Sequence, residues 1–83
     1  MNHFIRKFSV EGGDHLELYF SRIYTDDGEA YMVTTMDGQS HFHLFHMVSN
    51  EESWKIDRSK PHIAKWILEL EHELSTAIRS CGQ

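Results

Sequence analysis

Residues 31–45 read YMVTTMDGQSHFHLF, and this stretch decides the fold. Two runs rich in β-branched, aromatic and other apolar residues flank Asp37-Gly38, a dipeptide that is the strongest short-range signal for a β-hairpin. A two-residue turn at this position pairs Val33 with Phe42. We therefore predict two antiparallel strands joined by a type I′ turn.

Weaker turn signals divide the rest of the first 57 residues, at 12–14, 25–28 and 50–52. Loops there pair Val10 with Leu16, Phe20 with Val33, and Val48 with Trp54. All these choices place large apolar residues on one face of a sheet, because side chains alternate along a strand. The residues of that face are Phe4, Phe8, Val10, Leu16, Leu18, Phe20, Tyr31, Val33, Phe42, Leu44, Val48, Trp54 and Ile56. The sequence therefore predicts a five-stranded antiparallel meander, with strands over roughly 3–11, 15–24, 29–36, 39–48 and 53–57.

The hydrophobic period changes after residue 57. Apolar residues then recur at the i, i+3, i+4 spacing of an amphipathic helix over roughly 60–80, and Ser59 can cap its start. Such a helix is long enough to cover one face of the sheet. We expect one α+β domain over residues 1–83, ordered β-β-β-β-β-α in two layers. Trp54 and Trp66 are expected in the core, where the helix meets the last strand.

Composition narrows the class of protein. The chain has 83 residues, a formal net charge of -5 and a lone cysteine, Cys81. A single thiol and the absence of a signal-peptide pattern favour a cytoplasmic protein, and no apolar run is long enough to span a membrane. The acidic balance makes nucleic-acid binding an unfavoured function. No catalytic motif occurs, so we expect neither an enzyme nor a cofactor.

The face of the sheet turned away from the helix, here called the outer face, is too apolar for a freely solvated surface. The predicted register places on it the candidate interface or ligand residues Tyr19, Ile23, Met32, His41, His43, Phe45 and Met47. The favoured interpretation is a homodimer formed through this face, or through an edge strand over 4–10 or 54–57. Two alternatives remain: strong curvature that buries the face within one chain, and binding of a small ligand or single-stranded nucleic acid there.

The chain holds seven histidines, of which three lie in the segment 41–46. His41 and His43 leave the same face of a strand, while His46 points to the other face. Two imidazoles are a start for a transition-metal site, but a zinc site needs at least three protein ligands. We therefore predict no metal. Histidines at an interface could instead weaken it near pH 6 by becoming charged.

Overall fold

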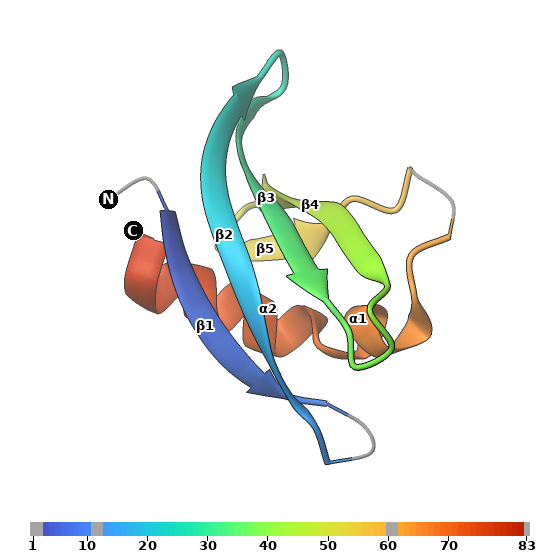
Figure 1. Ribbon diagram of the computed structural model, residues 1–83. Coiled ribbons are helices and arrows are strands. Elements are labelled where there is room, and N and C mark those ends of the chain that lie inside the picture. Colours follow the sequence, from blue (N-terminus) through green and yellow to red (C-terminus); the bar gives the residue numbers. More distant parts are fainter. Residues whose placement is uncertain (1–2, 11–12, 60–61, 83) are drawn as a thin grey trace.

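The computed structural model describes residues 3–10, 13–59 and 62–82 (Figure 1). The elements are, in order, β1 (His3–Ser9), β2 (His15–Thr25), β3 (Gly28–Met36), β4 (Phe42–Asn50), β5 (Ser53–Ile56), α1 (Lys65–Glu69), α2 (Glu71–Ala77) and the π-helical turn η1 (Ile78–Gly82). The predicted α+β class and its β-β-β-β-β-α order are confirmed. Residues 11, 60 and 61, at the ends of predicted elements, lie outside the described residues.

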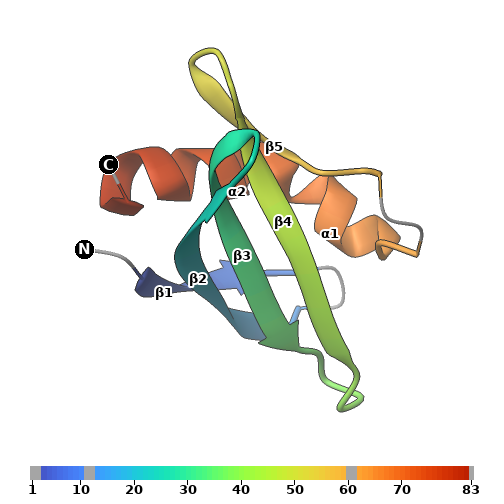
Figure 2. The ribbon, with the colours of Figure 1, turned by 90° about the horizontal axis from the view of Figure 1, so that it is seen from above.

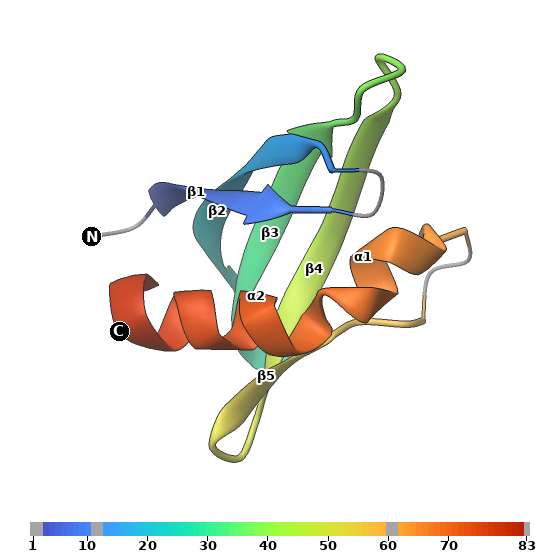
Figure 3. The ribbon, with the colours of Figure 1, turned by 90° about the horizontal axis from the view of Figure 1, so that it is seen from below.

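The strands form one antiparallel sheet in the order β1-β2-β3-β4-β5, and the sheet curls strongly (Figures 1 and 2). The helices lie across one face, which we call the inner face (Figure 3). Apolar residues from both layers fill the space between them, because alternate strand residues and one stripe of each helix point inward. The fully buried members include Leu18, Phe20, Tyr31, Val33, Met47, Ile67, Leu74 and Ile78.

The first two hairpins keep the predicted faces. The pairing of Phe20 with Val33 is confirmed. On β1, Phe8 pairs with Leu16, which is two positions away from the predicted register. A shift of two residues leaves every side chain on its predicted face, since the side-chain period of a strand is two.

The β3–β4 hairpin differs from the prediction. Its loop is Gly38–Ser40, and the N–H of Ser40 donates to the carbonyl of Asp37 (3.0 Å), while the N–H of Asp37 donates to the carbonyl of His41 (2.9 Å). Ser40 adopts a left-handed conformation with φ 64°. These features define a three-residue loop, a type I turn followed by a bulge, in place of the predicted two-residue type I′ turn. Val33 consequently pairs with Phe45 and not with Phe42.

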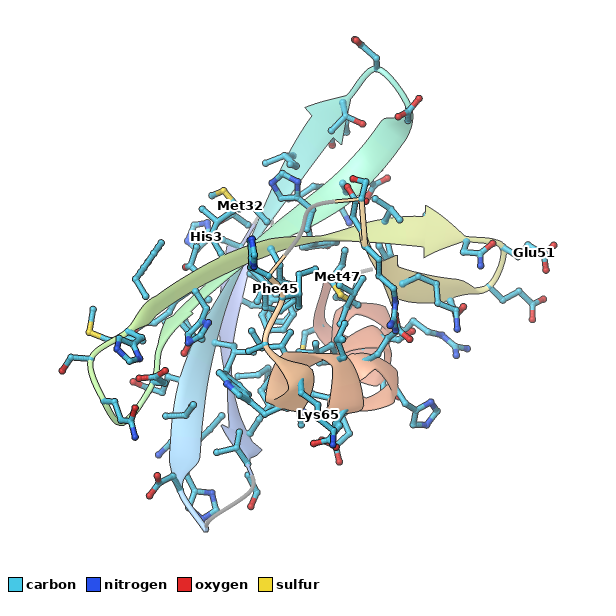
Figure 4. The ribbon with its side chains drawn as sticks, turned by 90° about the vertical axis from the view of Figure 1, so that its right-hand side faces the viewer. His3, Met32, Phe45, Met47, Glu51 and Lys65 are labelled. Carbon is cyan, nitrogen blue, oxygen red and sulfur yellow. The ribbon has the colours of Figure 1, made fainter. Side chains whose placement is uncertain are left out.

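This shift of three positions reverses the faces of β4. Phe45 and Met47 are 2% and 0% exposed and lie on the helix side of the sheet, whereas Met32 lies on the opposite side (Figure 4). Phe42 and Leu44, predicted to be in the core, are 63% and 44% exposed. The placement of Phe45 and Met47 on the outer face was therefore wrong.

The β4–β5 hairpin contains a second shift, of one residue. Ser49 pairs with Trp54, where the pattern predicted Val48 as the partner. This odd shift compensates for the odd shift before it, so Trp54 and Ile56 still point inward and are 3% exposed. Among the five strands, β4 alone presents the face opposite to the predicted one.

The C-terminal segment is helical but is not one straight helix. It begins at Lys65 after an extended Ala64, and no side chain of the described residues caps it. Ser59 does not act as the cap; its N–H donates to the carboxylate of Asp57 (3.0 Å). Leu70, with φ -89° and ψ 0°, separates α1 from α2. The resulting change of direction lets both short helices follow the curled sheet (Figure 3).

The two tryptophans lie in different environments. Trp54 is buried, and its ring meets Tyr31 edge-on at 5.1 Å between centroids. Trp66 is half-buried on α1 and meets His43 edge-on at 5.3 Å. Trp66 packs against the core as expected, but beside His43 of β4 and not against the last strand, because the helix that contacts β5 is α2.

Side chains of α2 close the outer edge of β5. The hydroxyl of Ser75 accepts a hydrogen bond from the N–H of Trp54 (2.9 Å), and the carboxylate of Glu71 accepts one from the N–H of Ile56 (2.8 Å). Both amides would otherwise be available to another strand. These bonds join the two layers and occupy the N–H groups of Trp54 and Ile56 at the edge of β5.

Two phenylalanines on β4 test its orientation. Phe45→Ala should lower the free energy of unfolding by about 3–5 kcal/mol, because it opens a cavity in the core. Phe42→Ala should change it by about 0.5 kcal/mol or less, as is usual for exposed positions. Urea unfolding of dilute protein measures both, and the opposite ranking would support a two-residue turn at Asp37-Gly38.

Ser75→Ala tests the hydrogen bond that joins α2 to β5. The variant leaves the buried N–H of Trp54 without its acceptor, so we expect a loss of about 1–3 kcal/mol in the free energy of unfolding. Thr76→Ala is the matched control, because Thr76 is exposed and bonds only within its own helix. Equal effects of the two substitutions would contradict the proposed role of Ser75.

Candidate functional site

The outer face of the observed sheet is apolar over β1 to β4. Three of the predicted interface residues, Tyr19, Ile23 and Met32, occupy it. The predicted register placed Phe45 and Met47 of β4 on this face, whereas the observed register places Phe42, Leu44 and Val48 there. Their exposed apolar neighbours on this face are Ile5 and Met36. The face therefore keeps its predicted character with different β4 residues.

Cross-strand pairing brings these side chains into rows. Tyr19 lies between Ile5 on β1 and Thr34 on β3, and Thr34 is paired in turn with Leu44 on β4. Met36 is paired with Phe42. Directly opposite residues on one face have Cβ atoms about 5 Å apart, so such side chains touch. Exposed apolar side chains from four strands thus share the outer face with a smaller number of polar ones.

Charges on the outer face are few and partly compensated. Lys7 and Glu17 are directly opposite each other on β1 and β2. Lys55 lies at the other end of the face, opposite Val48. The Arg22 side chain points to the inner face, where its guanidinium donates to the hydroxyl of Tyr31 (3.1 Å) and pairs with Glu29 (2.9 Å). The outer face consequently lacks a track of cations among the described residues.

The predicted outer-face histidines lie elsewhere. His43 points to the inner side, where its Nε2 is 2.8 Å from a carboxylate oxygen of Asp37. His41 reaches the same oxygen from the exposed loop end, with its Nδ1 at 3.6 Å. His46 is on the outer face, so the opposite orientation of His46 relative to His41 and His43 holds although the faces are exchanged. No group of three metal-ligating side chains occurs within the described residues.

Asp37 organises this hairpin end. Its side chain accepts hydrogen bonds from the backbone N–H groups of Gln39 (2.8 Å) and His41 (3.0 Å). The hydrogen bond with His43, together with those two amides, lowers the pKa of Asp37 to about 2. The charged carboxylate is thus the form that the folded loop requires. The sequence indicates Asp37 only as a turn residue, because the predicted two-residue turn does not place Gln39, His41 and His43 beside its carboxylate.

Comparison with protein-family models, with curated proteins and with solved structures gives no match for this chain. Across the described residues, no helix combines the length and the apolar character required to cross a membrane. What the fold and face define is therefore a class only: a small curled-sheet domain with one apolar face left uncovered by its own helices.

The role of Asp37 predicts a pH dependence. Its pKa is lower in the folded chain than the ordinary 3.8, so its contribution to stability is present above pH 3.8 and is lost as the pH falls through about 2. Asp37→Asn keeps an oxygen for the Gln39 and His41 amides but removes the charge beside His43. We expect this variant to be less stable than the parent at pH 5 and to approach it near pH 2.

Chemical denaturation across this pH range provides the measurement. Asp26→Asn, at the exposed β2–β3 turn, is the control for removing one negative charge. A constant difference between the parent and Asp37→Asn from pH 5 to pH 2 would contradict a role for the charged form.

Proposed function

We propose that this chain is a cytoplasmic interaction module that forms a homodimer through the outer face of its sheet. The observation that carries the proposal is the exposure of large apolar side chains from four adjacent strands on the face that the helices leave uncovered. Large exposed apolar patches mark sites of interaction with other proteins, membranes or ligands. Self-burial by curvature, the simplest alternative, fits poorly with side chains such as Phe42 and Met36, which stay 63% and 56% exposed.

The dimensions of the chain are compatible with a dimer of ordinary size. A standard protein–protein interface buries roughly 800 Å² on each partner. The chain exposes 5608 Å² in all and measures 34 × 27 × 18 Å, so it is a slab with two broad sides. Burial of the outer face in a dimer would stabilise the dimer by roughly 25 cal/mol for each Å² of apolar surface removed from water.

The charges on the face support a second copy as the partner. Lys7 lies opposite Glu17, so this part of the face is locally neutral and does not repel an identical face. Nucleic acid is a weaker candidate, because the described part of the face offers few cations and the chain carries a net charge of -5. Dimerisation through the 54–57 edge is also weaker, because Ser75 and Glu71 occupy its amides.

Light scattering over a range of concentrations tests the proposal. We expect a mass near twice 9.8 kDa for the parent chain. Leu44→Glu places a charge among the exposed apolar side chains of β4 and should raise the dissociation constant about a hundredfold or more, equivalent to about 2.7 kcal/mol. Leu44 is already 44% exposed in the single chain, so the fold should tolerate the change.

Tyr24→Glu is the matched control. Tyr24 is 75% exposed but lies at the β2–β3 hairpin end, on the alternate set of β2 side chains from Tyr19 and Ile23. It should leave the dimer intact. A parent mass near 9.8 kDa at every concentration up to about 100 μM would rule out a dimer with micromolar affinity.

A further inference from the structure

β4 is paired with β3 along most of its length and with β5 along only one end. β3 pairs with it from Phe42 to Val48, while β5 pairs only with Met47 to Asn50. Figure 2 shows β5 beside one end of β4, with no described strand continuing beside the other end. The part of β4 from Phe42 to Phe45 is therefore a half-edge.

The hydrogen bonds on either side of β4 show which amides this half-edge presents. The N–H of Asp37 donates to the carbonyl of His41, so odd-numbered residues of β4 bond toward β3. The N–H of Asp57 donates to the carbonyl of His46, so even-numbered residues point toward the β5 side. The backbone N–H and C=O groups of Phe42 and Leu44 thus project beyond the end of β5.

A cavity of about 190 Å³ lies beside these backbone groups. We call it the β4–α1 cavity; one wall is the half-edge and the opposite wall is formed by Ile63, Ala64 and Ile67. His62 and Asp57 line its rim. The cavity is on the inner side of the sheet, so it would receive a side chain pointing inward from a strand added to the half-edge.

β5 and the half-edge of β4 differ in the hydrogen bonding of their outward backbone groups. At β5, Ser75 and Glu71 accept hydrogen bonds from the amides that face away from the sheet. At the half-edge, no described side chain hydrogen-bonds to the backbone of Phe42 or Leu44. A row of unpaired backbone groups selects one kind of partner, an extended polypeptide with groups at the same spacing.

We propose that the half-edge of β4 binds a short extended segment of a partner protein by strand addition. The segment places two residues opposite Leu44 and Phe42, with their backbone groups bonded to β4 and their side chains beside the exposed Phe42 and Leu44 rows. The residue between them directs an apolar side chain of about leucine size into the β4–α1 cavity. This site uses the backbone of β4 and adjoins the proposed dimer face, because the two outward side chains of the segment would lie beside Phe42 and Leu44.

The probe is a synthetic peptide, acetyl-Lys-Val-Leu-Val-Lys-amide, added to the full chain with binding followed by NMR. We expect the largest shifts at the amides of Phe42 and Leu44. Methylation of both valine nitrogens removes the N–H groups that face β4 and should weaken binding more than tenfold. Methylation of the leucine nitrogen is the matched control, because that N–H points away from β4.

A variant tests the cavity. Ala64→Leu fills it from the α1 side and should weaken binding of the peptide at least tenfold, while Thr76→Leu, on the exposed side of α2, should leave binding unchanged. Amide hydrogen exchange shows whether each variant is folded, and in the parent it should show faster exchange at Phe42 and Leu44 than at His43 and Phe45.

Three results would overturn the proposal. The first is equal protection of all four of these amides in the free chain, which would mean that the half-edge is already paired. The second is equal binding of the two methylated peptides, and the third is no binding of the parent peptide. None of these results bears on the dimer, whose test is the mass of the chain without peptide.

Discussion

The architecture depends on the three-residue loop between β3 and β4. The carboxylate of Asp37 accepts hydrogen bonds from two backbone N–H groups of the loop, and Ser40 adopts the left-handed conformation. The pairing of the two strands then begins with Met36 opposite Phe42. A loop one residue shorter would turn every side chain of β4 over. The core would then lose Phe45 and Met47, and the outer face would gain them. One turn thus determines which β4 side chains enter the core and which lie on the exposed outer face.

Most of the fold could be predicted because the apolar pattern of four strands is unambiguous. On β2, Leu18 and Phe20 alternate with more polar neighbours, so burial alone sets the face and an error of two positions in the β1–β2 register does no harm. β4 has no such alternation: Phe42 and Leu44 compete with Phe45 and Met47, and both assignments satisfy the hydrophobic pattern. The decision then falls to loop geometry. Asp37-Gly38 suggests a type I′ turn, while the interactions that select the longer loop become visible only in three dimensions.

The candidate site was predictable to the same extent. Tyr19, Ile23 and Met32 were placed correctly because their strands were, whereas His41, His43, Phe45 and Met47 followed β4 to the wrong face. The helical region shows a similar limit. Periodicity indicates which helical residues face the core, but it carries no sign of the break at Leu70 or of the hydrogen bonds that Ser75 and Glu71 accept from β5. A side chain that accepts a hydrogen bond from the backbone of a distant strand adds no periodic pattern to the sequence.

The ambiguity of β4 has a functional meaning. A strand with large apolar residues on both faces is typical of a sheet that is covered on both sides. Here the helices cover Phe45 and Met47, while Phe42, Leu44 and Val48 remain exposed on the outer face. The same strand also retains an unpaired half-edge, although the neighbouring edge of β5 is closed by α2. Large apolar residues on both faces of β4 made its register hard to predict. Of these, the exposed residues are the ones that a second layer packed on the outer face would bury.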